Sequence, residues 1–295
     1  MSVALVLDGR AVTIEQAGPT DSLLDWLRLR MGRTGTKEGC AEGDCGACTV
    51  LVGTLEDDGL VWRAVNACIQ FLPMLHGKAV MTVESLGGPR APTALQVAMA
   101  GNGASQCGFC TPGFVMSLHG RCMGARGADL PLADALAGNL CRCTGYGPIL
   151  AAGEAAAPVQ RDDSGLVAQL RGIAGGLMPQ GAGPGGQWFA PRTVQELADL
   201  LARHPQARIV AGATDVGLWI TKALRDLPVA IFIGDIAELA TIAEDADGLT
   251  LGACVRYADA HAPLARLHPD MGELVRRIAG LQVRNAATIG GNIAN

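Results

Sequence analysis

The chain has 295 residues, of which 49% are hydrophobic and 17% are charged, and its formal net charge at pH 7 is −5. This acidic balance leaves no basic stripe to neutralise phosphates, which argues against a nucleic-acid partner. No apolar run approaches the roughly 18 residues that a membrane span needs, and no secretory signal opens the chain, so we expect a cytoplasmic protein without membrane contact.

Residues 1–84 are predicted to form a small mixed sheet over one helix. The alternation of apolar and polar residues around Asp8 and Gly9 predicts a β-hairpin, because both turn residues tolerate a positive φ. An N-capped helix is expected from Ser22 through the stretch that contains Trp26, which we interpret as a core residue. The expected strands are 49–53, 60–65 and 79–83, with a short turn between the first two.

A first cysteine quartet lies in this region and has the spacing of an electron-transfer site. It reads C-x4-C-x2-C with a fourth cysteine after nineteen further residues, which is the spacing of plant-type [2Fe–2S] ferredoxins: Cys40, Cys45, Cys48 and Cys68. A zinc site and disulfides are the alternatives. Disulfides suit small secreted domains, and structural zinc sites favour paired two-residue knuckles, so the spacing favours the cluster. Glu42 and Asp44 are interpreted as solvated charges that lower its potential or meet a partner.

Residues 85–157 change in character and predict four helices. Thr93 and Gln96 form a capping box, and Pro112, Pro131 and Pro148 each mark a first helical position. Because the motifs separate near residue 85, we expect the two halves of this N-terminal region to fold as independent units.

A second cysteine quartet lies in the helical region. It reads C-x2-C, thirty residues, then C-x-C: Cys107, Cys110, Cys141 and Cys143. By spacing alone, zinc remains an alternative to a second iron–sulfur cluster. Cys110 and Cys143 each stand just ahead of an expected helix start, where free N–H groups and the helix dipole favour the extra negative charge of a reduced cluster. The remaining cysteines, Cys122 and Cys254, are expected to be buried and inert.

Residues 158–187 are rich in glycine and proline and are predicted to be a linker. Gly181, Gly183 and Gly186 formally match G-x-G-x-x-G, but no strand is expected before them and Pro184 interrupts the motif, so we reject a dinucleotide fingerprint.

Residues 188–295 predict a mixed unit with two glycine turns. A helix capped by Thr193 and Glu196 precedes a strand at 208–211, a glycine turn, a helix to about Leu224 and a strand at 229–233. This order is favourable for binding phosphate, although a tight turn also needs glycine for steric reasons. A second glycine turn lies at 288–292. The five histidines lack a partnered carboxylate or nucleophile, so no catalytic residue is predicted.

Four motifs together resemble the molybdenum hydroxylases, and within that family the iron–sulfur and FAD subunit of the bacterial xanthine dehydrogenase type: C-AEGD-C-GA-C-T, Q-C-G-F-C-T-P-G-F, N-L-C-R-C-T-G-Y-G-P-I and A-T-I-G-G-N-I-A-N. The resemblance implies an α+β multidomain chain. It would comprise a plant-type ferredoxin β-grasp domain (1–84), a four-helix [2Fe–2S] bundle (85–157), a linker (158–187) and the N-terminal part of a vanillyl-alcohol-oxidase (PCMH) type FAD domain (188–295).

The resemblance also implies the cofactors. The first quartet would hold one [2Fe–2S] cluster and the second quartet the other. The residues assigned to FAD are Ile209, Val210, Ala211, Gly212, Ala213, Thr214, Asp215, Val216, Thr288, Gly291 and Asn292. Ala213 stands where a close relative has glycine, and Ile278 stands where relatives place an aromatic residue against the flavin. Gln106 and Cys143 match positions that approach the molybdopterin of a separate large subunit.

The function that the resemblance implies is electron transfer in an oxidoreductase. Electrons would pass from the molybdenum subunit through two clusters to FAD and then to NAD. The alternatives are a two-cluster relay module with a non-functional flavin remnant, and the redox subunit of an aldehyde oxidase or CO dehydrogenase type of hydroxylase. Because the chain stops at Asn295, within the family's flavin domain, we expect a truncated subunit that binds FAD weakly.

Overall fold

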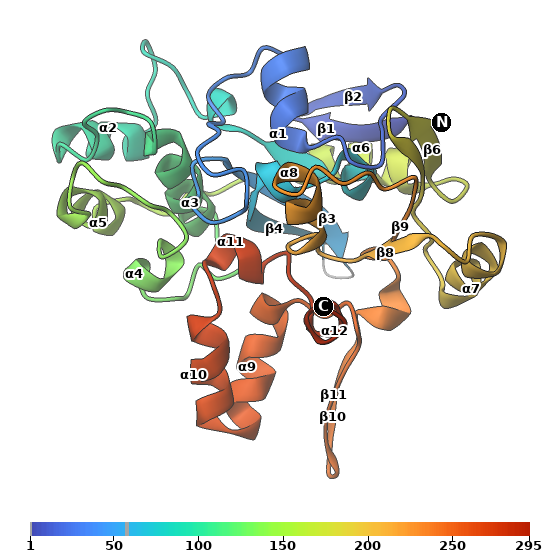
Figure 1. The fold of residues 1–295 in the computed structure, drawn as a ribbon. Coiled ribbons are helices and arrows are strands. Elements are labelled where there is room, and N and C mark those ends of the chain that lie inside the picture. Colours follow the sequence, from blue (N-terminus) through green and yellow to red (C-terminus); the bar gives the residue numbers. More distant parts are fainter. Residues whose placement is uncertain (1, 57–58) are drawn as a thin grey trace.

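The computed structural model describes residues 2–56 and 59–295 (Figure 1). The predicted turn between the strands expected at 49–53 and 60–65 therefore lies partly outside the described residues. The N-terminal unit is a five-stranded sheet in the order β2-β1-β5-β3-β4. Only the β1–β5 pairing within it is parallel. The strands are β1 (Val3–Leu7), β2 (Arg10–Ile14), β3 (Thr49–Glu56), β4 (Gly59–Asn66) and β5 (Ala79–Met81).

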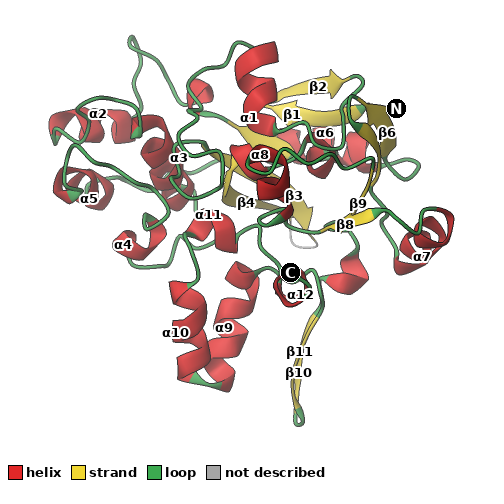
Figure 2. Cartoon of the chain, viewed as in Figure 1, coloured by secondary structure: helices red, strands yellow, loops and turns green. Residues whose placement is uncertain are grey.

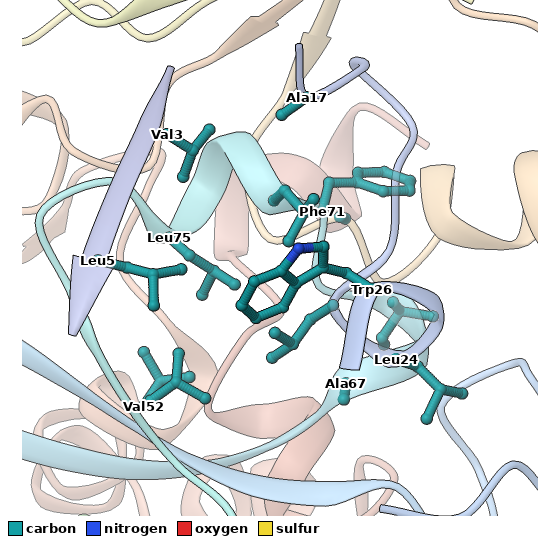
Figure 3. Packing of buried hydrophobic residues seen from close by; sticks show 14 of the residues in the cluster. Val3, Leu5, Ala17, Leu24, Trp26, Val52, Ala67, Phe71 and Leu75 are labelled. Carbon is teal, nitrogen blue, oxygen red and sulfur yellow. The ribbon is translucent and has the colours of Figure 1, made fainter. Parts of the chain in front are cut away.

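One face of this sheet packs against the predicted helix. Ser22 caps α1 (Leu23–Asp25) by accepting the N–H of Asp25 at 3.0 Å, and the helix continues as a π-helical turn over Trp26–Arg30. Trp26 is buried beside Phe71 in the core, as Figure 3 shows, which confirms its predicted role. Since side chains alternate along a strand, Leu5 and Val52 point to this face, and their neighbours Val6 and Leu51 point to the other.

The second face is covered by the helical unit, so the two units that we expected to fold independently share a core in the folded chain. Val6, Leu51 and Trp62 of the sheet share one core with Phe114 of α3 and Leu170 of α6. The four predicted helices are present as α2 (Ala94–Gly101), α3 (Thr111–Cys122), α4 (Leu132–Ala135) and α5 (Gly147–Glu154). The predicted capping box of α2 is confirmed, because Thr93 and Gln96 exchange both of its hydrogen bonds.

The predicted linker contains regular structure. A helix, α6 (Ser164–Ala174), buries Leu170 completely, and a hairpin of β6 (Gln180–Gly183) and β7 (Gly186–Phe189) turns at Pro184 and Gly185. The helix was missed because its glycine content weakens the apolar period. The glycine motif here forms a hairpin turn with no helix after it, which agrees with its rejection as a nucleotide fingerprint.

The C-terminal unit is built on a second sheet, in the order β6-β7-β9-β8. Figure 2 shows the strands of the chain in yellow. In the second sheet, β7, β9 and β8 are parallel, and α9 and α10 lie side by side away from this sheet (Figure 1). The remaining elements are α7 (Val194–Arg203), β8 (Arg208–Val210), α8 (Val216–Thr221), β9 (Val229–Phe232), β10 (Ile242–Asp245), β11 (Gly248–Leu251), α9 (Tyr257–Leu267), α10 (Pro269–Arg277), α11 (Leu281–Arg284) and α12 (Ile289–Ile293).

The C-terminal unit is joined to the first by a shared core. Trp188, Val210 and Phe232 are buried in the same cluster as Trp26, and the indole N–H of Trp188 donates to the carbonyl of Ala17 at 2.9 Å. Within residues 2–56 and 59–295, no helix is both long and apolar enough to cross a membrane.

Candidate cluster and cofactor sites

The first cysteine quartet gathers at one end of the β-grasp sheet. Cys40, Cys45 and Cys48 lie on the loop before β3, and Cys68 lies on a single 3-10 turn directly after β4. The sulfurs of Cys48 and Cys68 are 3.4 Å apart and buried. Ala41, Gly43 and Gly46 have positive φ, and these left-handed residues let the loop turn tightly between its cysteines.

The loop of the first quartet is arranged to hold negative charge on sulfur. The backbone N–H groups of Cys45 and Glu42 donate to Sγ of Cys40 at 3.3 and 3.5 Å. A hydrogen bond from the Cys68 thiol and these amides lower the pKa of Cys40 to about 3, against the effect of its burial. The hydrogen bonds to Cys40 and Cys48 raise the pKa of the Cys68 thiol. Binding of a metal centre would need all four thiols deprotonated.

The second quartet lies on the loops before α3 and α5. Cys107 and Cys143 lie close enough for their thiols to perturb each other's pKa, and so do Cys110 and Cys141. Burial alone would raise the pKa of Cys141, but the hydroxyl and N–H of Thr144 outweigh it and lower that pKa to about 7. Cys107 and Cys143 are exposed, whereas Cys141 is buried.

Of the two cysteines predicted to stand just ahead of a helix, Cys110 does so and Cys143 does not. Cys110 is the N-cap residue of α3. Cys143 lies before the N-cap residue of α5, which is Tyr146 with φ +70°. The N–H of Thr144 in this loop donates to Sγ of Cys141 at 3.5 Å, because the loop turns toward the buried cysteine.

The donor sets fit [2Fe–2S] clusters. Each quartet offers four cysteine thiols and no histidine, and a [2Fe–2S] cluster is held by four thiolates, two at each of its irons. In the part of the chain that the structure describes, no three side chains of His, Cys, Asp or Glu converge as a single-metal site. Four thiols in each quartet, with backbone amides that donate to Cys40 and to Cys141, suit the negative charge of a cluster.

The two cysteine loops contact each other through their backbones. The N–H of Leu140 donates to the carbonyl of Cys45 at 2.9 Å, and the side chain of Asn139 donates to the carbonyl of Gly46 at 3.1 Å. A Cβ on Gly46 would lie 2.1 Å from the carbonyl oxygen of Gly138, so only glycine fits there. One hydrogen bond therefore separates Cys45 of the first quartet from the residue before Cys141 of the second.

The two segments assigned to FAD lie side by side. A Cβ on Gly212 would lie 1.9 Å from the carbonyl oxygen of Ala286, so the first glycine turn packs directly on the chain that leads into the second. Thr288 caps α12 by accepting the N–H of Gly291 at 3.2 Å, and Asn292 is exposed. Ala213 has φ +57°, so this alanine adopts the conformation that glycine favours.

The first FAD segment fits an anionic group. In the described ranges, the backbone N–H groups of residues 212–215 donate no hydrogen bond to the protein. Successive free N–H groups around a residue with positive φ form a concave site for phosphate. The cavity between this segment and the β-grasp sheet has a volume of about 60 Å³, which has room for a few waters. Ile278 packs within the core of α9 and α10.

Three family descriptions match the chain in succession. Residues 5–71 match the 2Fe-2S iron-sulfur cluster binding domain, residues 82–154 match the [2Fe-2S] binding domain, and residues 183–295 match the FAD binding domain in molybdopterin dehydrogenase. The chain belongs to the molybdenum hydroxylase family. The molybdenum hydroxylase chain thus contains two [2Fe–2S] domains and an FAD-binding domain, and its α+β multidomain fold agrees with the sequence prediction.

Known members of the family are similar over most of this chain. Aldehyde oxidase 2 of Cavia porcellus is 34% identical over 97% of the chain, and xanthine dehydrogenase of Emericella nidulans is 31% identical over 99% of it. The chain spans 26% of the length of each of these relatives. Quinoline 2-oxidoreductase from Pseudomonas putida 86 is 30% identical, with 58% of this chain and 96% of that chain covered and a TM-score of 0.42.

Several residues that join the units were not predicted from the sequence. The buried side chain of Gln282 on α11 donates to Asn139 at 2.8 Å and to Thr49 at 3.2 Å, so it contacts both N-terminal units. Asparagine and glutamine carry no distinctive spacing, and no sequence signal identifies such a contact. Of the two cysteines that were expected to be buried and inert, Cys254 is buried and Cys122 is only half-buried. Burial raises the pKa of both thiols, that of Cys254 to about 11.

Proposed function

We propose that this chain is the electron-transfer part of a xanthine-dehydrogenase-like or aldehyde-oxidase-like oxidoreductase. A separate large subunit would hold the molybdopterin and supply two electrons from each substrate oxidation. Each bound cluster would carry one electron at a time toward FAD, with NAD as the final acceptor. The first quartet, Cys40, Cys45, Cys48 and Cys68, and the second quartet, Cys107, Cys110, Cys141 and Cys143, would be the ligands.

The hydrogen bond between the two cysteine loops carries this proposal. The carbonyl of Cys45 and the N–H of Leu140 are 2.9 Å apart, so the quartets are linked through one backbone bond. On the far side of the first quartet, α8 packs against the turn that carries Cys68, since a Cβ on Gly217 would lie 2.9 Å from Ile69. Because α8 begins at the first FAD segment, the order is second quartet, first quartet, FAD segment.

The exposed end of the second quartet supports a partner subunit there. Gln106, Cys107 and Cys143 are exposed, and the large apolar side chains of Phe109 and Leu140 around them are each 48% exposed. Apolar side chains gathered at the rim of a redox site favour a protein partner over bulk solvent. A cofactor on that partner could then approach the cluster through Cys143.

Replacing Cys143 by Ser should remove the second cluster and leave the first. Cys143 is exposed and contributes little to the core, so the variant should remain folded. Electron paramagnetic resonance of the dithionite-reduced chain should show one of two signals lost. Cys122→Ser is the matched control, because this cysteine belongs to neither quartet, and both signals should survive in it. Loss of both signals in soluble Cys143→Ser protein, or loss of either in Cys122→Ser, would contradict the assignment.

A further inference from the structure

One lysine of the C-terminal unit reaches the loop of the first quartet. Lys222 directly follows α8, and its Nζ donates to the carbonyl of Cys40 at 2.7 Å. The same Nζ lies 3.1 Å from Oε2 of Glu42. Since Cys40 and Lys222 are 182 positions apart, the fold brings this charge to the cysteine loop.

The backbone that carries Lys222 is held in place independently of these two polar contacts. Gly217 of α8 is buried against Ile69, and Val216, Leu218 and Ile220 pack against the core of the β-grasp sheet. The helix therefore keeps its position when only the end of the Lys222 side chain is changed. A substitution at this position tests the charge and its hydrogen bond rather than the packing.

The charge of Lys222 bears on the redox behaviour of the first quartet. Reduction of a cluster adds one negative charge, which a nearby cation stabilises, and net charge and exposure help to set cluster potentials. The negative charge of Glu42 alone would destabilise the reduced cluster and so lower its reduction potential. This inference rests on the proposed function. We propose that Lys222 is a positioning residue, which holds the Cys40 carbonyl and Glu42. Its charge thereby raises the reduction potential of the first-quartet cluster. Electrons then favour the cluster next to the FAD segment.

The test is a redox titration of the full chain, followed by electron paramagnetic resonance. In Lys222→Met, we expect the ratio of reduced to oxidised first cluster at a fixed potential to fall by up to about tenfold, equal to about 59 mV for one electron. The second cluster should titrate as in the unaltered chain. Lys222→Arg, which keeps the charge, should restore the potential. Because the Lys222 side chain is 46% exposed, the shift should shrink at high salt.

Two further variants separate this effect from a general loss of contact. Lys78 also joins the β-grasp and C-terminal units, through Asp235 at 2.8 Å, and it donates to the carbonyl of Met74, away from the cysteines. Lys78→Met should therefore leave the potential unchanged, whereas Glu42→Gln should raise it. An unchanged potential in Lys222→Met, or an equal shift in Lys78→Met, would overturn the proposal. If the unaltered chain gives no cluster signals, the proposed function fails instead.

Discussion

Replacing Asp259 by Asn should lower the free energy of unfolding by about 3 kcal/mol, because a buried ion-pair network would lose one of its two carboxylates. Asp259 on α9 accepts from Arg63 at 3.1 and 3.2 Å and pairs with Arg126 at 2.9 Å. The Arg63 side chain is only 4% exposed, and its other carboxylate partner is Glu56 at 2.6 Å. All three units supply members of this network: Arg63 and Glu56 from the β-grasp unit, Arg126 from the helical unit, and Asp259 and Arg256 from the C-terminal unit.

The effect of Asp259→Asn is measured by urea denaturation followed by circular dichroism. Asp270→Asn is the matched control, since the Asp270 side chain on the neighbouring α10 is 93% exposed and lies 3.8 Å from the imidazole of His268. That control should change the free energy of unfolding by less than about 0.5 kcal/mol. Equal losses in the two variants would show that the network contributes nothing beyond a surface charge.

Replacing Gly46 by Ala should disrupt the contact between the two cysteine loops. Its φ is +70°, and the added Cβ would lie 2.1 Å from the carbonyl oxygen of Gly138 and 2.6 Å from Nδ2 of Asn139. Left-handed strain costs about 1–2 kcal/mol, and separating the loops would also break the bonds from Asn139 and Leu140. We expect a loss of at least about 3 kcal/mol in the free energy of unfolding.

Gly32→Ala separates strain from the clash in this experiment. Gly32 has φ +66°, and no atom lies within 4 Å of an added Cβ. The free energy of unfolding of this variant should therefore fall only by the cost of the left-handed strain. Denaturation curves of the two variants give the difference directly. In Gly46→Ala, transfer between the clusters after partial reduction should also become slower. A Gly46→Ala variant as stable as Gly32→Ala would mean that the loops do not pack as described.

The features that the sequence predicted correctly are those set by short spacing. The hairpin at Asp8 and Gly9, the capping box at Thr93 and the core role of Trp26 depend on residues within a few positions of each other, where local physics decides. The cysteine spacing also predicts both quartets as cluster ligands, and this assignment stays a prediction. The division into three matched segments followed from long motifs quoted by resemblance.

The features that the sequence did not predict depend on contacts between distant segments. The shared core at the boundary near residue 85 was not predicted, because it forms where α3 and α6 cover the apolar second face of the β-grasp sheet. The bonds from Lys222 to Cys40 and from Gln282 to Asn139 join ordinary polar residues that no pattern marks. A polar side chain reveals such a role only once the fold supplies its partner.

The most direct test of the account is the iron and acid-labile sulfide content of the purified chain, measured with its reduced-state electron paramagnetic resonance spectrum. Two [2Fe–2S] clusters predict about four iron and four sulfide per chain and two distinct signals. Zinc in place of iron, or about two iron and a single signal, would contradict the assignment of a cluster to each quartet.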